Sequence, residues 1–150
     1  MRVKDCMTKE VLTVKPQTTL AELNRIFKKH SYEVLPVVDD DNNLVGLVDK
    51  AVLLTIFLPD YIGLVESLDF IEDFGALEEE FKNMPVLELF VVGDLMVKEI
   101  VTITETSSVI KAAAVMEKNG IKRLPVTKDN KLIGLITLSD VCNALFKNGV

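Results

Sequence analysis

Hydrophobic and polar positions divide the chain into short apolar runs and longer stretches with helical spacing. The short runs are rich in β-branched residues and are bounded by turn-forming residues, which is typical of strands. They lie at 11–14, 34–38, 44–48, 100–103, 123–127 and 132–136. The second and third runs enclose a polar turn, as do the fifth and sixth, so each of these two pairs predicts a β-hairpin.

Two stretches between these runs have the period of an amphipathic helix. Their apolar positions are Leu20, Leu23, Ile26 and Phe27 in the first stretch, and Val109, Ala112, Val115 and Met116 in the second. The pairs Thr18-Thr19 and Ser107-Ser108 precede them, and hydroxyl side chains accept hydrogen bonds from the free N–H groups of a first helical turn. We therefore expect a capped helix in each stretch, and a further helix after each hairpin.

The whole pattern occurs twice along the chain. Residues 3–38 align with 92–127, and with one extra residue in the turn 39–43 the match continues into the last helix. The predicted divisions are 1–54 for the first repeat, 55–91 for a helical insert or linker and 92–150 for the second repeat. Each repeat has the order β-α-β-β-α, and strands this short and apolar need helices packed over them. The predicted fold class is α/β (α+β), with the two units packed as a pseudo-twofold pair.

The composition is that of an ordinary globular protein, with 150 residues of which 49% are hydrophobic and 27% charged. The formal net charge of −6 argues against nucleic acid and against an anionic membrane as partners, because both require a basic face. No apolar run approaches the roughly 18 residues of a membrane span, and the first residues lack a signal-peptide core. Two cysteines without paired spacing fit a reducing compartment, so we expect a cytoplasmic protein.

One seven-residue segment occurs in both copies, but only the second copy has the hydroxyl side chains and the final carboxylate. The segment GLITLSD carries Thr137, Ser139 and Asp140, whereas the matching segment GLVDKAV has Asp49 and Val52. A helix N-terminus with hydroxyl donors attracts phosphate, and a carboxylate one turn later accepts hydrogen bonds from ribose hydroxyls. The alternative is that Ser139 or Asp140 caps the helix and binds nothing.

Three motifs, repeated in the same order, carry a resemblance to a known family. They are V-x-D-x-M before the first strand of each copy, x-x-L-P-V in the next strand, and G-h-h-T-x-x-D (h, hydrophobic) at the end of the second copy. With these motifs the chain resembles a tandem pair of cystathionine-β-synthase (CBS) domains, often called a Bateman module. The resemblance implies a non-catalytic regulatory module that senses AMP, ADP, ATP or S-adenosylmethionine as its ligand and has no other cofactor. It also implies a homodimer of four CBS units in a flat assembly.

In this family one domain supplies the ribose and phosphate end of each cleft and its sister supplies the walls around the base. The residues assigned in this way are Thr137, Ser139 and Asp140 at the ribose and phosphate end, Leu12, Thr13, Tyr32, Glu33 and Val34 around the base, and Lys122 and Arg123 beside the phosphates. Plainer interpretations stay open for two of these groups. Tyr32 also fits a half-buried tyrosine at a strand entrance, and the two cations also fit a solvated strand end.

The first copy lacks the chemistry of the second. Val52 cannot accept a ribose hydroxyl, and Asp49 places a negative charge where phosphate would approach. The counterparts of the two cations in the first copy are Glu33 and Val34. The sequence therefore predicts one competent cleft, which uses Thr137, and one degenerate cleft that holds at most a less anionic ligand.

Other motifs bear on the function less directly. The acidic segment at 39–43 predicts a turn and not a calcium loop, since Leu44 and Lys50 stand where an EF-hand needs Gly and Glu. We find no metal-ligand spacing and no nucleophile–base pair, and so expect no catalysis. The phenylalanines of the insert are Phe57, Phe70, Phe74, Phe81 and Phe90. They cover the protein's own core, or they form a surface for an unidentified partner protein. The alternative function is accordingly a structural or protein-interaction module whose clefts are vestigial.

Overall fold

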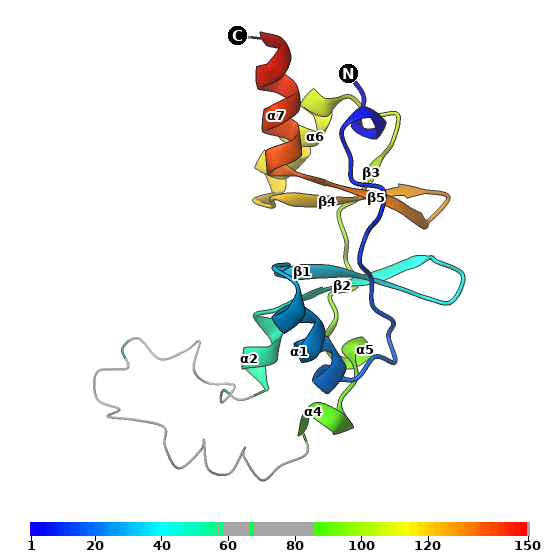
Figure 1. Ribbon diagram of the computed structural model, residues 1–150, viewed down its shortest axis with the longest axis vertical. Helices are drawn as coiled ribbons and strands as arrows, with labels where there is room; N and C mark the ends of the chain where they lie inside the picture. The colour runs from blue at the N-terminus through cyan, green and yellow to red at the C-terminus, as the bar shows by residue number, and fades with distance from the viewer. Residues whose placement is uncertain (57, 59–66, 68–85, 150) are drawn as a thin grey trace.

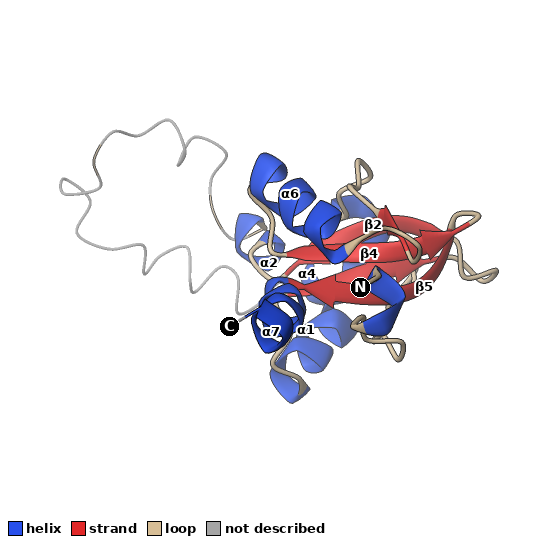
Figure 2. Ribbon diagram, turned by 90° about the horizontal axis from the view of Figure 1, so that it is seen from above, coloured by secondary structure: helices blue, strands red, loops and turns tan. Residues whose placement is uncertain are grey.

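The computed structural model describes residues 1–56, 58, 67 and 86–149. Two small sheets lie one above the other at the middle of the molecule, and helices cover the outer side of each sheet (Figure 1). Seen from above, the strands of both sheets lie over one another between these helices (Figure 2). The predicted α+β fold, with two similar units packed as a pair, is confirmed.

The first unit is built on an antiparallel hairpin. Its elements are α1 (Leu20–Lys29), β1 (Val34–Val38), β2 (Leu44–Asp49), α2 (Val52–Thr55), α4 (Val86–Leu89) and α5 (Val92–Leu95). In the hairpin, Val34 pairs with Asp49 and Leu35 pairs with Val48. The side chain of Leu35 is 1% exposed, because the helices of this unit pack over that face of the hairpin.

The second unit repeats this hairpin and adds a short parallel strand. Its elements are the 3-10 helix η1 (Val3–Asp5), β3 (Ile103–Thr104), α6 (Val109–Asn119), β4 (Arg123–Lys128), β5 (Lys131–Thr137) and α7 (Leu138–Gly149). Strand β3 runs parallel to β4, and β4 is antiparallel to β5. Leu124 is the second residue of β4 and pairs with Ile136, just as Leu35 is the second residue of β1. The two leucines therefore occupy equivalent positions, as the repeat predicts.

The first predicted strand of each copy is much shorter in the structure than in the sequence pattern. In the run 11–14 only Val14 forms a bridge, in parallel to Val37, and the strand at 100–103 begins at Ile103. The predicted strand at 11–14 is therefore wrong. The apolar residues of these runs still pack inward, since Val14 is 4% exposed and Ile103 is 5% exposed. Burial accounts for the pattern that resembled a strand, although the backbone of each run pairs over only one or two residues.

Both long helices begin where the sequence predicts. The hydroxyl of Thr19 accepts a hydrogen bond from the amide of Glu22 at 3.2 Å, and the hydroxyl of Ser108 accepts one from the amide of Lys111 at 3.1 Å. Each bond satisfies one of the N–H groups that a helix leaves free at its start. The predicted apolar faces are the ones that pack inward, with Ile26 and Val115 at their half-buried margins.

The first element of each repeat packs into the core of the other repeat. Val3 of η1 is fully buried against α6 and β4, and its amide donates to the carbonyl of Ser107 at 2.9 Å. Val92 of α5 is fully buried in the core around α1, and its amide donates to the carbonyl of Thr18 at 2.8 Å. The divisions 1–54 and 92–150 therefore describe repeats in the sequence, whereas the two packing units exchange their first segments.

The tips of the two hairpins are joined to each other. The amide of Leu44 donates to the carbonyl of Asn130 at 2.9 Å, and the amide of Leu132 donates to the carbonyl of Asn42 at 3.1 Å. These two bonds are related by the sequence repeat. Beneath them the side chains of Val38, Leu44 and Leu132 form a small buried cluster. The two units are consequently fixed to one another at this end of the sheets.

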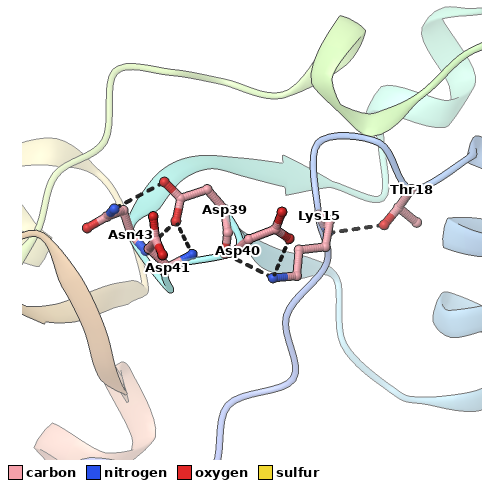
Figure 3. Close-up of polar contacts among 6 residues, drawn as sticks. All are labelled: Lys15, Thr18, Asp39, Asp40, Asp41 and Asn43. Carbon is pink, nitrogen blue, oxygen red and sulfur yellow. Dashed lines mark hydrogen bonds and ion pairs between the residues drawn. The ribbon is translucent and has the colours of Figure 1, made fainter.

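The acidic segment forms the turn that the sequence predicts (Figure 3). The carboxylate of Asp39 accepts hydrogen bonds from the amides of Asp41 and Asn43 and from the side-chain nitrogen of Asn43. These bonds, with those from Asn43 first, hold the pKa of the Asp39 carboxyl below its ordinary value. The Lys15 ammonium contacts the carbonyl of Asp39 at 2.9 Å and the carboxylate of Asp40 at 3.4 Å. All the oxygens of Asp39 are therefore used to shape the turn.

Most of the insert lies outside the described residues. Phe57, Phe70, Phe74 and Phe81 are among the residues that are not described, and so are most of the helices expected there. At the end of the insert, the carbonyl of Phe90 accepts a hydrogen bond from the amide of Leu20, and the Phe90 side chain is 44% exposed. None of the helices within the described residues is long and apolar enough to cross a membrane.

Candidate functional site

Two pockets lie between the hairpins of the two units. The first, here the Thr137 pocket, has a volume of about 90 Å³ and is formed by the segment that leads into the first unit, by β1 and by the end of β5. Its lining residues are Thr8, Glu10, Val11, Leu12, Tyr32, Val34, Leu35, Pro36, Leu135 and Thr137. Both units therefore contribute to its walls.

The second, here the Arg123 pocket, is the counterpart of the first and has a volume of about 290 Å³. Its lining residues are Val34, Pro36, Leu47, Asp49, Val97, Glu99, Val101, Ile121, Lys122, Arg123, Pro125 and Leu135. The sequence repeat relates Glu99 to Glu10, Arg123 to Val34 and Asp49 to Thr137. The two pockets thus have one plan, and they differ in the side chains that each copy places on it.

Backbone pairing between segments distant in sequence fixes the walls of both pockets. Thr8 and Leu135 exchange two hydrogen bonds of 2.8 and 2.9 Å, and Val97 and Leu47 exchange two of 2.9 and 2.8 Å. Each pair joins the segment that enters one unit to the second hairpin strand of the other unit. The pocket walls are therefore held by main-chain contacts that do not depend on which side chains are present.

The glycine of the repeated G-h-h motif is explained by this close approach. A Cβ atom added at Gly134 would lie 2.7 Å from the sulfur of Met7 and 3.0 Å from the carbonyl oxygen of Thr8. At the matching Gly46, an added Cβ atom would lie 2.6 Å from the sulfur of Met96. A side chain at either position would push away the segment that closes the pocket.

Thr137 and Asp140 form a reciprocal cap at the start of α7. The carboxylate oxygen Oδ2 of Asp140 accepts from the amide and from the hydroxyl of Thr137, both at 2.8 Å. The hydroxyl of Thr137 in turn accepts from the amide of Asp140 at 3.2 Å. The capping interpretation of the motif is therefore what the contacts show. The second carboxylate oxygen, Oδ1, makes no hydrogen bond to any described residue, so the role of Asp140 toward a ribose stays a prediction.

The structure brings together one group of the residues that the sequence assigned to the site. Leu12, Tyr32, Val34 and Thr137 line the Thr137 pocket. The Tyr32 ring is 45% exposed and also stacks with the ring of His30, at 6.0 Å between centroids. Three further residues, Thr13, Ser139 and Asp140, do not line this pocket, and Glu33 lines a separate depression of about 500 Å³ together with Asp49 and Lys50.

The two predicted phosphate-binding cations lie in the other pocket. Lys122 and Arg123 line the Arg123 pocket together with Asp49, and neither lines the Thr137 pocket. In the hairpin Arg123 is the direct partner of Thr137, yet Arg123 lines the pocket that contains Asp49, whereas Val34, its counterpart in the first copy, lines the pocket that contains Thr137. The pocket linings therefore do not group these cations with Thr137, and their role toward a phosphate stays a prediction.

Several lining residues were not singled out from the sequence. They include Thr8 and Glu10 in the Thr137 pocket, Val97 and Glu99 in the Arg123 pocket, and Pro36 and Leu135, which line both. Each of these residues lies in or next to a repeated motif, so the sequence did mark its position. The sequence did not show that it lines a pocket, because that depends on the entry segment of one unit crossing the hairpin of the other.

The described residues include two free cysteine thiols, those of Cys6 and Cys142. Burial raises the pKa of the Cys6 thiol, and the carboxylates of Asp140 and Asp5 raise it further, so this thiol stays protonated near neutral pH. Among the described residues, no three His, Cys, Asp or Glu side chains gather as a metal site. What the two pockets provide is apolar walls, backbone groups and a few charges, which is the composition of a binding site.

Comparison with known protein families finds the same domain in both repeats. The profile of the CBS domain matches residues 3–58 and 92–147. The chain is 31% identical over 157 aligned residues to an uncharacterised protein of Methanocaldococcus jannaschii, and the match covers 97% of this chain and 91% of that protein. It is 32% identical over 150 aligned residues to a CBS domain-containing protein of Dictyostelium discoideum, again covering 97% of this chain and 91% of the relative.

Solved structures of CBS-pair proteins have the same fold as this chain. The crystal structure of CBSX2 in complex with AMP superposes with a TM-score of 0.71 at 28% identity, covering 97% of this chain and 96% of that chain. A second crystal structure of CBSX2, from Arabidopsis thaliana, gives a TM-score of 0.73 at the same identity. Two matched segments, two equivalent hairpins and two pockets between them lead to one conclusion. The chain belongs to the CBS domain family and carries two CBS domains in tandem.

Proposed function

We propose that this protein is a regulatory, non-catalytic module that binds an adenosine compound between its two CBS domains and passes the effect of binding to a partner protein. The observation that carries the proposal is the pair of repeat-related pockets, each with walls from both domains. A purine is flat and apolar on its faces, and walls such as Pro36, Leu47 and Pro125 suit it.

The solved relatives support an adenosine ligand. CBSX2, which is 28% identical over nearly its whole length, was crystallised in complex with AMP. AMP is therefore the first ligand to test on this chain, and ADP, ATP and S-adenosylmethionine are the further candidates. Nothing in this choice needs a reacting group, because a sensor only has to bind.

The position of the pockets gives a physical route from binding to regulation. A ligand in either pocket contacts the hairpins of both domains at once, so it stabilises the relative placement of the domains that fits it best. Binding shifts the population toward that placement by as much as the ligand's affinity differs between placements. A partner that contacts both domains then reads the occupancy of the pocket.

A thermal-shift panel tests this proposal. Purified protein is heated with AMP, ADP, ATP, S-adenosylmethionine or, as a control, GMP. A ligand present at 100 times its Kd adds about 2.7 kcal/mol of stability, which raises the melting temperature of a chain of this size by several degrees. A shift with an adenosine compound and not with GMP supports the proposal. A panel in which no adenosine compound shifts the melting temperature contradicts it.

A second candidate, a protein-interaction module, is favoured by one feature of the surface. Large apolar side chains are exposed at both ends of the molecule, namely Leu54 at 61%, Leu89 at 72%, Ile110 at 63% and Phe146 at 65%. Side chains of this kind mark contact surfaces when they gather in patches. We propose that they contact a second copy of the chain, as in the expected homodimer. If this second candidate is the function, the protein forms its dimer but binds none of the nucleotides in the thermal-shift panel.

A further inference from the structure

Two methionines that the proposed function does not use lie where each entry segment crosses the hairpin of the opposite unit. Met7 and Met96 occupy the same place in the two copies, at the end of the V-x-D-x-M motif. A Cβ atom added at Gly134 would lie 2.7 Å from the sulfur of Met7, and one added at Gly46 would lie 2.6 Å from the sulfur of Met96. Each thioether therefore fills the space that the glycine leaves beside the hairpin.

The backbone on both sides of each methionine is hydrogen-bonded. The amide of Met7 donates to the carbonyl of Val3 at 2.9 Å, and the next residue, Thr8, makes the paired bonds with Leu135 that close the pocket wall. The second copy has the corresponding bonds on both sides of Met96. The entry segment consequently cannot move away from the hairpin at the methionine without breaking main-chain hydrogen bonds.

The surroundings of these two side chains differ from those of the other described methionines. Met7 and Met96 are half-buried, and they pack against the apolar cores of the second and the first unit, respectively. Met116 is 3% exposed inside a core, and Met1 is 57% exposed at the start of the chain. Half-burial leaves part of each side chain within reach of a small oxidant while its sulfur lies against the hairpin.

A peroxide oxidises a methionine thioether to the sulfoxide. The sulfur lone pair attacks one oxygen of hydrogen peroxide, an S–O bond forms as the O–O bond breaks, and the other oxygen leaves as water. The sulfur is oxidised by two electrons and the peroxide is reduced by two. At Met7 and Met96 the new oxygen adds bulk beside the glycine and places a polar group against apolar side chains. Both effects favour the separation of the entry segment from the hairpin.

We infer that Met7 and Met96 are sites of modification by peroxide, and that their oxidation to the sulfoxide releases the entry segments from the hairpins. The residues that follow them line the pockets, Thr8 in the Thr137 pocket and Val97 in the Arg123 pocket. Release of a segment therefore removes part of a pocket wall, and a methionine sulfoxide reductase reverses the change. The release follows from the packing and needs no ligand, so the inference stands apart from the proposed function.

The thiol of Cys6 is the competing target beside Met7. Burial and the nearby carboxylates raise its pKa, so the thiol stays protonated near neutral pH and reacts slowly with peroxide, because the thiolate is the reactive form. The variants that test the inference retain Cys6 and Cys142. A response that depends on a thiol is therefore visible in them.

Peroxide treatment of the full chain, followed by measurements without ligand, tests the inference. Peptide mass spectrometry is expected to locate a sulfoxide at Met7 and at Met96. The amides of Leu135 and Leu47 donate the bonds to the entry segments, and their hydrogen exchange is expected to speed up roughly tenfold, within the range of an overpacking penalty. The melting temperature is expected to fall by several degrees. Methionine sulfoxide reductase should restore both properties.

Substitution by leucine separates these sulfurs from the other oxidisable groups. The double variant Met7→Leu, Met96→Leu nearly keeps the volume of both side chains and is expected to fold and to lose the response to peroxide. Met116→Leu, which removes a sulfur buried in the core, is the matched control and should respond as the wild type does. If the double variant does not fold, the two single variants replace it, and each is expected to lose the response at its own hairpin only.

Three outcomes overturn the inference. The first is a response that persists in the double variant, because the oxidised group is then one that the variant retains, such as a cysteine. The second is the absence of sulfoxide from Met7 and Met96 at a peroxide concentration that oxidises the exposed Met1. The third is sulfoxide at both sites with unchanged hydrogen exchange in the hairpins.

Discussion

At the scale of single residues, close contacts explain why the first residue of the G-h-h motif is glycine. The glycines at 46 and 134 lie where the entry segment of the opposite domain crosses a hairpin strand. The sequence showed that both copies keep a glycine there. It did not show what approaches the glycine, because the segment concerned lies more than a hundred residues away along the chain in the second copy.

Replacing Gly134 with alanine tests this explanation. The added Cβ atom would meet the carbonyl oxygen of Thr8 at 3.0 Å as well as the side chain of Met7, so backbone must move. We expect a loss of roughly 1–3 kcal/mol in the free energy of unfolding, measured by urea denaturation. Gly46→Ala is the comparison, since its contacts are all with the Met96 side chain, and it should cost less. An equal or smaller loss for Gly134→Ala contradicts the explanation.

The cap at α7 gives a second test at this scale. Asp140→Ala removes the acceptor of two hydrogen bonds from Thr137 and should lower the free energy of unfolding by about 1 kcal/mol. Ser139→Ala is the control, because the Ser139 side chain is exposed and makes no hydrogen bond to a described residue. Denaturant unfolding of both variants checks this. If Asp140→Ala leaves stability unchanged, the cap does not stabilise α7 and this explanation of the motif fails.

Asp39 sets part of the stability of the turn in acid. Its folded pKa is lowered by bonds from Asn43, so ionised Asp39 stabilises the native state above the unfolded pKa of about 4, and this contribution is lost as the pH falls through the folded value. The melting temperature of Asp39→Asn should therefore fall less between pH 5 and pH 3 than that of the wild type. Asp41→Asn, with no side-chain bond to a described residue, should follow the wild type.

At the scale of elements, the sequence pattern predicts what is local. Both long helices, their caps and both hairpins follow from periodicity and turn residues, because neighbours along the chain determine them. The strand at 11–14 was overpredicted, since buried β-branched residues look alike whether or not their backbone is paired. The exchange of η1 and α5 between the domains was not predictable from two identical-looking copies, in which either arrangement gives the same pattern.

Core substitutions test the exchange. Val3→Ala should destabilise the native state by roughly 2 kcal/mol, the value of a buried valine, although Val3 stands at the very start of the first repeat. The location of the change in hydrogen exchange is more informative than the size of the loss in stability. Hydrogen exchange should speed up mainly in α6 for Val3→Ala and mainly in α1 for Val92→Ala. Faster exchange in α1 on substitution of Val3 would mean that each repeat packs on itself.

At the scale of the whole molecule, the repeat predicts two related pockets but not which side chains share one. Lys122 and Arg123 stand next to Leu124-Pro125 in sequence, and the sequence places them in the same repeat as Thr137. In the structure both cations line the other pocket, although Arg123 is paired with Thr137 in the hairpin. Assigning a residue to a pocket requires the direction of each strand relative to the pseudo-twofold axis, and the order of motifs does not contain it.

The expected homodimer is also a prediction at this scale. The chain has a mass of 16.7 kDa, so light scattering at micromolar concentration should give about twice that value. Phe146→Glu, on the outer surface of α7, should lower the mass toward that of the monomer if this end of the molecule forms the contact. Lys147→Glu introduces the same acidic side chain at its exposed neighbour without removing an apolar one, and it should leave the dimer intact. A wild-type mass near 17 kDa would contradict the dimer.

The union of the hairpin tips has a mechanical consequence. The bonds between Leu44 and Asn130 and between Leu132 and Asn42 hold the two sheets together at one end, while both pockets lie toward the opposite ends of the strands. A rotation of one sheet about the joined tips would therefore displace the walls of each pocket farther than it displaces the tips. A ligand that bridged both walls would oppose such a rotation, and the tips would be its pivot.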